Sequence, residues 1–449
     1  MSYIPVMRFG HRVQGTIQGF DDKGRGIFDQ FAIPFSTTGD EVVATFTTRD
    51  RKQKICKIES VEKPGADRVA TVCPHAGVCG GCLWQHIRYE KQLELKRDMV
   101  NQALAQAGHE ERVAEVMACQ TAELPPFHFR NRMDYAVGWN GEIGLKEFGA
   151  WNRYLDLKTC LLLEPGVERI LVQVREWMHA SDLQPWDAKF YTGDVRYVVV
   201  REGKNTEQCL IVIVVKDQTR VTEAMRDDLR ERLSPFATSL LLGEQNLTTD
   251  LSFAQTFITL KGEAYLEEVA NGLRYRIHPN SFFQTNTRMA EELQKCVLDF
   301  SNTHVVLDLY CGLGFFGIYL AKNLPAARVH GFELDEHAIE LAKFNAAQNG
   351  VAERCEFFAG KAEDLAWKNI PADTVILDPP RSGLHPKVLK TVLEMKPSNI
   401  IYVSCNYHRL VEELKLLKTA YTVEGIKAFD LFPHTPHVEV VVKLVGKSE

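Results

Sequence analysis

The C-terminal third of the chain alternates short apolar runs with helical stretches, and this alternation limits the fold more than any other feature. The apolar runs are Val305–Tyr310, Val329–Leu334, Cys355–Ala359, Thr374–Leu377 and Asn399–Ser404. Helical periodicity marks two stretches between or after them, Glu336–Asn349 and Tyr407–Thr419. Strands that alternate with helices form a parallel sheet with helices on both faces. The pattern therefore predicts a doubly wound α/β domain over residues 291–449.

The end of the chain departs from this alternation. Two further apolar runs, Thr422–Phe432 and Val438–Val445, are separated only by Pro433–His437. So short a connection requires the two strands to pair antiparallel. A parallel sheet finished by an antiparallel hairpin is the Rossmann-like arrangement of S-adenosylmethionine-dependent methyltransferases. A pure dinucleotide-binding domain would lack the hairpin.

A glycine-rich loop follows the first apolar run. Gly312–Gly317 matches G-x-G-x-x-G, a spacing that lets a nucleotide cofactor approach the backbone closely. Carboxylates lie at the ends of three runs, at Asp308, Glu333 and Asp378. An acid at the end of the first strand favours the cationic sulfonium of S-adenosylmethionine over NAD. The alternative from another class is an iron–sulfur oxidoreductase that uses the loop for NAD.

Cys405 directly follows the run Asn399–Ser404. A residue at the carboxyl end of a buried strand lies where open α/β sheets bind their ligands. An isolated cysteine there is more often a core residue. A thiol beside a crevice lined with carboxylates nevertheless indicates covalent catalysis, and we take Cys405 as the candidate nucleophile.

Three cysteines stand close together in a glycine-rich segment, at Cys73, Cys79 and Cys82. Three thiols within ten residues are typical of a metal centre, and both zinc and cubane iron–sulfur sites take four ligands. Candidates for the fourth ligand are Cys56, Cys119 and Cys160. Spacing alone does not choose among them or identify the metal.

The remaining sequence predicts two further domains. Residues 1–62 show short alternating runs split by Gly and Asp, which predicts a small OB-like β-barrel of the kind that binds oligonucleotides. Residues 63–290 mix strand and helix patterns, as expected for an α+β middle domain that contains the cysteine segment. The basic and aromatic stretch Phe127–Arg132 and the basic run Arg49–Lys54 are candidate RNA contacts.

Composition excludes few classes of protein here. The net charge of −6 neither indicates nor excludes nucleic-acid binding, because affinity depends on local phosphate contacts. No apolar run is long enough to span a membrane, and the first residues do not resemble a signal peptide. We therefore expect a cytoplasmic protein that does not bind a membrane, and a monomer. Its eleven cysteines are then reduced thiols or metal ligands rather than disulfides.

Taken together, these motifs resemble those of the S-adenosylmethionine-dependent RNA (uracil-5-)-methyltransferases over nearly the whole chain. The resemblance rests on the cysteine triplet, on the segment Phe282–Asn286, on Asp378–Gly383, on Ser404–Asn406 and on Phe432–Glu439. It implies an N-terminal TRAM-like barrel and an enzyme that forms 5-methyluridine in 23S ribosomal RNA or in tRNA.

The resemblance also implies roles for individual residues. Cys405 corresponds to the nucleophile that adds to uracil C6, and Glu439 to the base that removes the C5 proton. The cofactor-site positions are Gln284, Tyr310, Glu333 and Asp378. The ligands of a [4Fe–4S] cluster are Cys73, Cys79, Cys82 and Cys160.

Several alternatives stay open at this point. We prefer 23S rRNA as the substrate, because a TRAM-like barrel together with a cysteine cluster resembles the members that act on it. Uridine 54 of tRNA is the alternative RNA. An RNA cytosine-5 methyltransferase would also use a thiolate, but it does not usually pair Ser-Cys-Asn with the late segment ending in Glu439. A silent RNA-binding module would not need Cys405.

Overall fold

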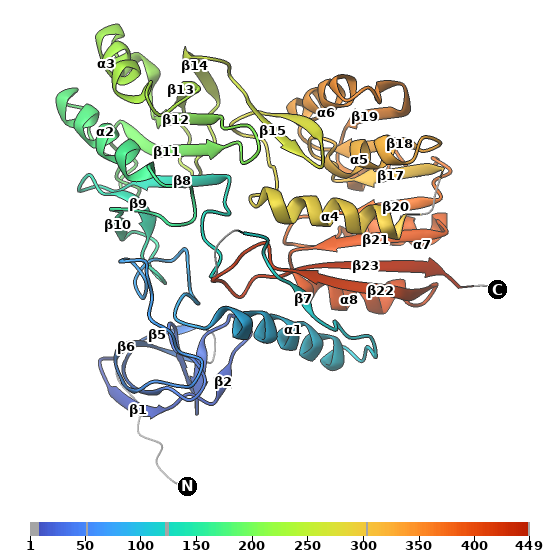
Figure 1. The fold of residues 1–449 in the computed structure, drawn as a ribbon, viewed down its shortest axis with the longest axis horizontal. Helices are drawn as coiled ribbons and strands as arrows, with labels where there is room; N and C mark the ends of the chain where they lie inside the picture. Colours follow the sequence, from blue (N-terminus) through green and yellow to red (C-terminus); the bar gives the residue numbers. More distant parts are fainter. Residues whose placement is uncertain (1–8, 51–52, 122–124, 302–303, 448–449) are drawn as a thin grey trace.

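The computed structural model describes residues 9–50, 53–121, 125–301 and 304–447. Three large sheets are built from successive stretches of the chain, apart from one short strand that joins the last sheet (Figure 1). The predicted fold class is confirmed: a C-terminal α/β sheet with a terminal antiparallel pair, an N-terminal β domain and mixed α/β structure between them.

The N-terminal sheet has the strand order β1-β5-β6-β4-β3-β2 and curls around its own core at the lower left of Figure 1. Its core includes Val42, Ala44 and Phe46, which come from every second position of one strand. The strands are β1 (Arg12–Thr16), β2 (Gly19–Phe20), β3 (Gly26–Phe28), β4 (Phe31–Ile33), β5 (Glu41–Asp50) and β6 (Gln53–Lys63).

The central sheet has the order β10-β9-β8-β11-β12-β13-β14. Its middle strands are buried almost throughout because α2 (Val167–Ala180) and α3 (Glu223–Leu233) pack beside each other against the sheet (Figure 1). The strands are β8 (Arg132–Val137), β9 (Ile143–Lys146), β10 (Tyr154–Asp156), β11 (Val195–Glu202), β12 (Cys209–Val215), β13 (Ser239–Glu244) and β14 (Thr256–Lys261), with the turn η1 (Gln218–Arg220).

A separate hairpin, β15 (Leu266–Ala270) and β16 (Leu273–Ile277), leads from the central sheet to α4 (Thr287–Phe300). It packs against α6 (Glu336–Gln348) of the C-terminal domain, where the Asn345 side chain accepts a hydrogen bond of 2.8 Å from the Arg276 backbone. Hydrogen bonding between the hairpin backbone and the Asn345 side chain therefore connects the central region to the C-terminal domain.

The C-terminal sheet has the order β19-β18-β17-β20-β21-β23-β22-β7. The first five strands are parallel, and β23 pairs antiparallel with both β21 and β22. The strands are β17 (Val305–Leu309), β18 (Arg328–Glu333), β19 (Cys355–Ala359), β20 (Thr374–Leu377), β21 (Asn399–Ser404), β22 (Tyr421–Phe429) and β23 (Glu439–Gly446). All seven lie within a few residues of the positions that the sequence predicts.

Helices cover both faces of this sheet. One core contains α4, α5 (Phe315–Asn323) and α6, and another contains α7 (Pro386–Met395) and α8 (Tyr407–Leu417). Two short turns, η2 (Ala352–Arg354) and η3 (Ala362–Asp364), complete the domain. Gly350 lies in the left-handed region two residues after α6, as the sequence pattern predicts for a helix end.

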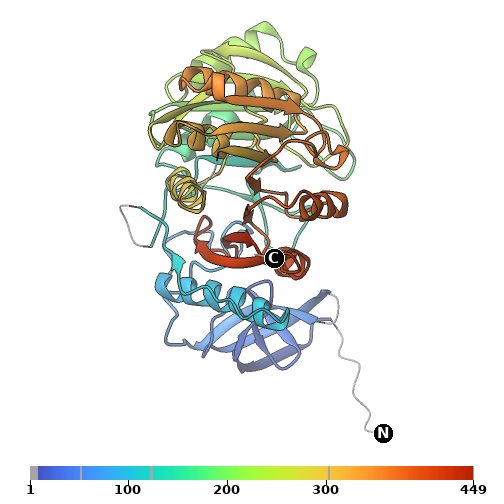
Figure 2. The same cartoon turned by 90° about the vertical axis from the view of Figure 1, so that its right-hand side faces the viewer.

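Two elements from the first half of the chain also pack on the C-terminal domain. Helix α1 (Tyr89–Gln106) contributes Val100 and Leu104 to the same core as α7 and α8, and β7 (Val116–Met117) pairs parallel with β22. Figure 2 shows α1 between the N-terminal sheet and the C-terminal domain. The sequence does not predict this docking, because α1 lies more than 300 residues from β22 along the chain.

Within the described residues, no helix combines the length and the apolar character that a membrane crossing requires.

Gly331 in β18 gives a test of this packing. A Cβ built there would clash with the Phe357 ring and lie 2.9 Å from Cys311 Sγ, both in a buried layer. We expect Gly331→Ala to destabilise the C-terminal domain by about 1–3 kcal/mol through overpacking. Gly360→Ala is the matched control, because its Cβ would meet nothing within 4 Å. Thermal unfolding measures both variants, and equal midpoints would contradict the packing described here.

Candidate active site

Three carboxylates come together where the parallel strands end. Asp308 belongs to β17, Glu333 ends β18 and Asp378 follows β20, and these strands are neighbours in the sheet. The pKa of Asp308 is raised to about 7 and that of Asp378 to about 8, mainly by burial and in smaller part by the neighbouring acids. A cation bound beside these two acids would favour their ionised forms.

The glycine loop lies over this cluster. The Gly317 backbone donates a hydrogen bond of 3.0 Å to Asp308, and the Gly312 backbone donates one of 3.3 Å to Glu333. A Cβ on Gly312 would meet nothing within 4 Å, so this part of the loop faces open space. Tyr310 precedes the loop in the left-handed region, with φ 66°, and is half-buried. The loop thus leaves room for a ligand beside the acids.

Cys405 and Glu439 lie at the same edge of the sheet as these acids. Cys405 follows the parallel strand β21, whereas Glu439 begins the antiparallel strand β23, and Ser404 pairs with Val440. Because β23 runs in the opposite direction, its first residue meets the last residues of β21. The structure therefore brings the two predicted catalytic residues together.

Cys405 opens into a pocket of about 620 Å³. The pocket lies between four parts of the chain: the β2–β3 turn, the cysteine segment, the stretch before β8 and the C-terminal strand ends. The residues of its wall include Lys23, Arg130, Arg381, Cys405, Asn406, Phe432, Thr435, His437 and Val438. Its volume and mixed lining suit a nucleotide-sized group.

The electrostatics of the pair explain its resting state. Burial raises the pKa of the Cys405 thiol to about 11, with smaller contributions in the same direction from Glu439 and Asp378. Burial also raises the pKa of Glu439, which is 2% exposed, well above its usual range, and Asp378 adds to this. Arg381 opposes both shifts through its positive charge. Burial therefore favours the protonated forms of both groups.

Gln284 lies in the segment before α4, and neighbouring groups fix its position. Its carbonyl accepts a hydrogen bond of 2.8 Å from the Asn131 side chain, and the Asn131 backbone donates to Thr285 at 2.8 Å. Gln284 is buried and is not among the residues that line the pocket around Cys405. The segment is thus ordered from the central domain rather than from the C-terminal sheet.

The cysteines predicted as metal ligands line a second, small cavity together. Cys73, Cys79, Cys82 and Cys160 all belong to its wall, and the other lining residues are mostly apolar. Among the described residues, no three His, Cys, Asp or Glu side chains are arranged to hold a single metal ion. Cys56 instead packs in the core of the N-terminal sheet, and the Cys119 thiol contacts Asn286 at 3.2 Å.

The donor set of this cavity fits a cluster in which each iron atom takes one thiolate. Burial raises the pKa of Cys79 to about 11, of Cys82 to about 12, and also that of Cys160. Neighbouring groups oppose these shifts: the Gly81 backbone 3.4 Å from Cys79 Sγ, the Gln85 side chain beside Cys82, and the Leu162 backbone, the Tyr135 hydroxyl and Arg130 beside Cys160. The cavity thus has hydrogen-bond donors and a cation for anionic sulfur.

The candidate RNA contacts separate into different roles. Phe127 is 9% exposed and stacks on His434 at a centroid distance of 4.7 Å, so its ring is not available to an RNA base. Arg132 pairs with Asp134 at 2.7 Å. Arg130 lines the catalytic pocket, and Arg51 and Lys52 of the basic run lie outside the described residues.

Some pocket residues carry no role in the sequence-based prediction. Arg381 and His437 lie within the motifs Asp378–Gly383 and Phe432–Glu439, so a signal for them exists in the sequence. Lys23 and Arg25 come from the β2–β3 turn of the N-terminal sheet. Nothing in the sequence indicates that this turn reaches the pocket of the C-terminal domain.

Chemically, the site combines a thiol and a carboxyl group at one edge of a sheet with an acidic cluster beside a glycine loop. A thiol that becomes a thiolate can add to an electrophilic ring carbon, and a carboxylate of raised pKa is a strong base once ionised. These are the groups that covalent catalysis on a nucleobase in the pocket would need.

Comparisons with known proteins agree with this chemistry. A family model described as tRNA (Uracil-5-)-methyltransferase matches residues 229–447. The chain is 35% identical to the tRNA (uracil(54)-C(5))-methyltransferase of Pyrococcus furiosus, over 96% of this chain and 99% of that protein. It is also 35% identical to the 23S rRNA (uracil(747)-C(5))-methyltransferase of Pyrococcus abyssi, over 96% and 99%.

A solved structure extends the similarity to the fold. The crystal structure of Pyrococcus abyssi tRNA (uracil-54, C5)-methyltransferase in complex with S-adenosyl-L-homocysteine matches with a TM-score of 0.81 and 33% identity, covering 96% of this chain and 99% of that one. The chain therefore belongs to the RNA (uracil-5-)-methyltransferase family, whose members transfer a methyl group from S-adenosylmethionine to C5 of a uridine in RNA.

Proposed function

We propose that this enzyme methylates uracil through a covalent adduct, with Cys405 as the nucleophile and Glu439 as the base. The observation that carries the proposal is the meeting of these two side chains at one edge of the sheet, with Cys405 open to a pocket of about 620 Å³. A uridine in an RNA loop would have to leave its stack to enter this pocket.

The reaction needs both residues because uracil C5 is too weak a nucleophile to take a methyl group unaided. Addition of the Cys405 thiolate to C6 makes C5 nucleophilic and splits one difficult step into easier ones. S-Adenosylmethionine supplies the methyl group when bound. Glu439 then accepts the C5 proton, and the C6–S bond breaks to regenerate the Cys405 thiolate and the C5=C6 double bond.

Arg381 is the cation of this pocket that favours the charged forms of both groups. Its positive charge lowers the pKa of Cys405 and of Glu439, against the effect of burial. Arg381 also accepts at its backbone carbonyl a hydrogen bond of 2.8 Å from Asn406, the residue after the nucleophile. We assign Arg381 to the stabilisation of the thiolate on this basis.

The cofactor site lies over the acidic cluster. Tyr310, Glu333 and Asp378 surround the open side of the glycine loop, and a sulfonium there would favour the ionised acids. Gln284, a buried residue whose carbonyl accepts a hydrogen bond from the Asn131 side chain, is the fourth cofactor residue that we propose.

A [4Fe–4S] cluster on Cys73, Cys79, Cys82 and Cys160 is part of the proposal. Its support is the shared cavity of the four thiols and the donors around it. No step of methyl transfer requires the cluster. Its role is to hold the cysteine segment, whose Gly80 and Gly81 line the catalytic pocket, against the central sheet. The N-terminal sheet is proposed as a TRAM-like RNA-binding barrel.

The substrate that we propose is a uridine of 23S rRNA. A specific observation favours tRNA as the second candidate: tRNA uridine-54 enzymes are similar to this chain both in sequence and in structure. Transcripts of both RNAs are therefore the substrates in the first experiment.

The first test traps the covalent adduct on RNA that contains 5-fluorouridine, because fluorine at C5 cannot leave as a proton does. We expect an adduct that is stable in a denaturing gel and depends on S-adenosylmethionine. Cys405→Ala should abolish it. On ordinary RNA, Glu439→Gln should lower turnover at least about a hundredfold and accumulate methylated RNA bound to the protein.

Cys296→Ala is the matched control, because this buried thiol lies on α4, away from the pocket. It should form the adduct at the native rate. An adduct that survives Cys405→Ala, or normal turnover of Glu439→Gln, would remove these residues from the roles proposed. Mapping the crosslinked nucleotide identifies the RNA and the uridine.

The acidic cluster gives a second test through the pH dependence of cofactor binding. Asp378 has a pKa raised to about 8, and a sulfonium favours its ionised form, so binding should release protons. The affinity for S-adenosylmethionine should therefore rise between pH 6 and 8, by about tenfold for one proton released per unit of pH.

S-Adenosylhomocysteine is the matched ligand for this test, because its sulfur is neutral. Its affinity should change less over the same range, and Asp378→Asn should reduce the difference between the two ligands. Isothermal titration calorimetry in buffers of different ionisation enthalpy counts the protons released. Equal pH dependence for both ligands would place the sulfonium away from Asp378.

The proposed cluster has a readout that is independent of activity. Anaerobic reconstitution with iron and sulfide should load about four iron atoms per chain. Cys73→Ser should lower the iron and acid-labile sulfide content, whereas Cys209→Ser, on β12 of the central sheet, should not. Iron content that is insensitive to Cys73→Ser, or equally sensitive to Cys209→Ser, would argue against a cluster in this cavity.

A further inference from the structure

The loop between β22 and β23, residues 430–438, forms one wall of the catalytic pocket. Phe432, Thr435, His437 and Val438 of this loop line the pocket that contains Cys405. The next residue is Glu439, the proposed base. The shape of the loop therefore decides how a uracil ring sits between the two catalytic side chains.

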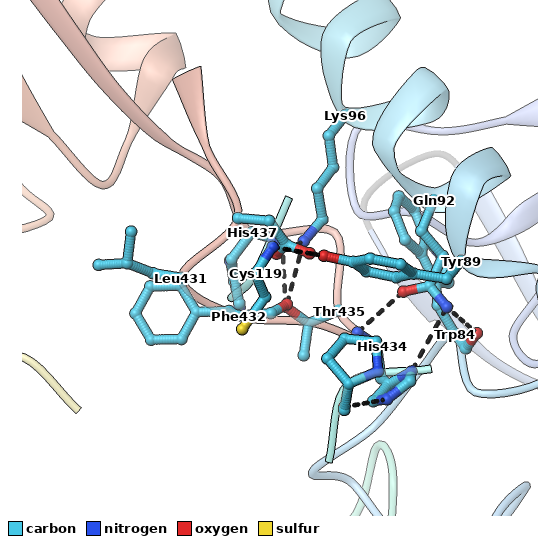
Figure 3. Close-up of polar contacts among 12 residues, drawn as sticks. Trp84, Tyr89, Gln92, Lys96, Cys119, Leu431, Phe432, His434, Thr435 and His437 are labelled. Atoms are coloured by element: carbon cyan, nitrogen blue, oxygen red, sulfur yellow. Dashed lines mark hydrogen bonds and ion pairs between the residues drawn. The ribbon is translucent and has the colours of Figure 1, made fainter. Parts of the chain in front are cut away.

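The loop depends on contacts from outside the C-terminal sheet. Helix α1 lies against it, and the Lys96 ammonium forms an ion pair with Asp430 at the start of the loop (Figure 3). The same ammonium donates a hydrogen bond of 3.0 Å to the carbonyl of Phe432. Both charged side chains are 0% exposed. One buried cation thus holds the loop at two points.

The second oxygen of Asp430 is also bonded. It accepts a hydrogen bond of 2.9 Å from the Tyr89 hydroxyl, which itself accepts one of 2.7 Å from the Cys119 backbone. The Asp430 backbone donates to the carbonyl of Met117 in β7 at 2.9 Å. The carboxylate therefore links α1, the β7 segment and the loop.

A further contact from α1 holds the middle of the loop. Gln92, one helical turn before Lys96, accepts a hydrogen bond of 2.9 Å from the backbone of His434 and donates one of 3.1 Å to the carbonyl of Trp84 (Figure 3). Its side chain also donates to the carbonyl of Ile87 at 2.8 Å. His434 has φ 64°, in the left-handed region that a non-glycine residue occupies only when its surroundings impose it. The surroundings here include α1, Trp84 and the ring of Phe127.

Stability alone does not explain a buried ion pair at this position. Two charges lose their hydration on burial, and apolar residues of similar size are often as stabilising or more so. What the ion pair provides is a fixed geometry with directional bonds. The carbonyl of Phe432 is bonded by Lys96 and by the Thr435 hydroxyl at 2.8 Å, in the part of the loop that lines the pocket.

We propose that Lys96 is a positioning residue for methyl transfer: paired with Asp430, it fixes the pocket wall from Phe432 to His437 so that the target uracil is held against Cys405. The inference rests on the proposed covalent role of Cys405. By this inference, α1 contributes to catalysis indirectly, because its Lys96 positions the loop that lines the pocket.

The experiment separates positioning from stability with two variants. Lys96→Met removes the ammonium but leaves the Asp430 carboxylate buried without its cation, and it should unfold at a lower temperature. The double variant Lys96→Met/Asp430→Asn leaves no charge buried and retains a partner for Tyr89. Its thermal midpoint should recover to near the native value. Neither variant restores the ammonium donor to the Phe432 carbonyl.

The main readout is the rate of covalent capture of 5-fluorouridine RNA at saturating RNA and S-adenosylmethionine. We expect the double variant to capture RNA about ten- to a hundredfold more slowly than the native enzyme, as for a small misplacement of reacting groups. Its affinity for S-adenosylmethionine should stay within about twofold, because the bonds that Lys96 and Asp430 form go to α1, β7 and the loop itself and not to the acidic cluster or the glycine loop.

Lys418→Met is the matched control. Lys418 pairs with Glu111 at 2.7 Å, at the opposite end of the contact between the α1 region and α8, and it does not line the pocket. It should capture RNA at the native rate. Recovery of the capture rate together with the thermal midpoint in the double variant would overturn the inference. Absence of any Cys405-dependent adduct in the native enzyme would instead overturn the proposed function.

Discussion

The antiparallel strand β23 lies between β21 and β22, and the active site depends on this placement. In an all-parallel sheet, every strand would bring its last residue to the catalytic edge, and the first residue of a strand would lie at the far edge. Reversing one strand brings Glu439, a first residue, beside Cys405, which follows the last residue of its neighbour. The proposed nucleophile and the proposed base thus occupy one edge although their strands run in opposite directions.

Burial then sets the resting charge of this edge. Asp308 and Asp378 have pKa values raised to about 7 and 8, and the Cys405 thiol to about 11. These raised values favour the protonated thiol and leave the two acids partly protonated at neutral pH, which limits the negative charge that burial would penalise. A bound cation would change this balance, because it favours the ionised acids.

The C-terminal domain is highly predictable because its signals are local. Each parallel strand is a continuous apolar run, and Gly350 ends a helix pattern. The last two apolar runs are separated only by Pro433–His437, and so short a connection requires them to pair antiparallel. The strand-end acids and Cys405 follow from these runs, because the carboxyl ends of parallel strands share one edge of a sheet. Glu439 is different: its role is implied by the motif it belongs to, and the reversed strand gives the physical reason afterwards.

What the sequence does not predict depends on contacts between distant segments. Lys96 reads as one more charged residue of an amphipathic helix, and its burial follows only from its pairing with Asp430, 334 residues away. Phe127 reads as an RNA-stacking ring but packs on His434. In both cases the local pattern is that of a surface, and the tertiary partner that covers it carries no sequence signal near the residue.

The tryptophan at position 84 has a consequence for how this molecule is divided into parts. Its indole donates to the carbonyl of Gly24 in the N-terminal sheet at 2.7 Å. Its backbone donates to the carbonyl of His434, in the loop between β22 and β23, at 2.8 Å. Pro436 packs against the same glycine. The N-terminal sheet is thus not an independent RNA-binding domain, because it packs on the residues that shape the loop between β22 and β23. A chain shortened to its C-terminal half would keep strands β17–β23, but it would lose β7 of the same sheet and the residues from the first half of the chain that line the pocket around Cys405.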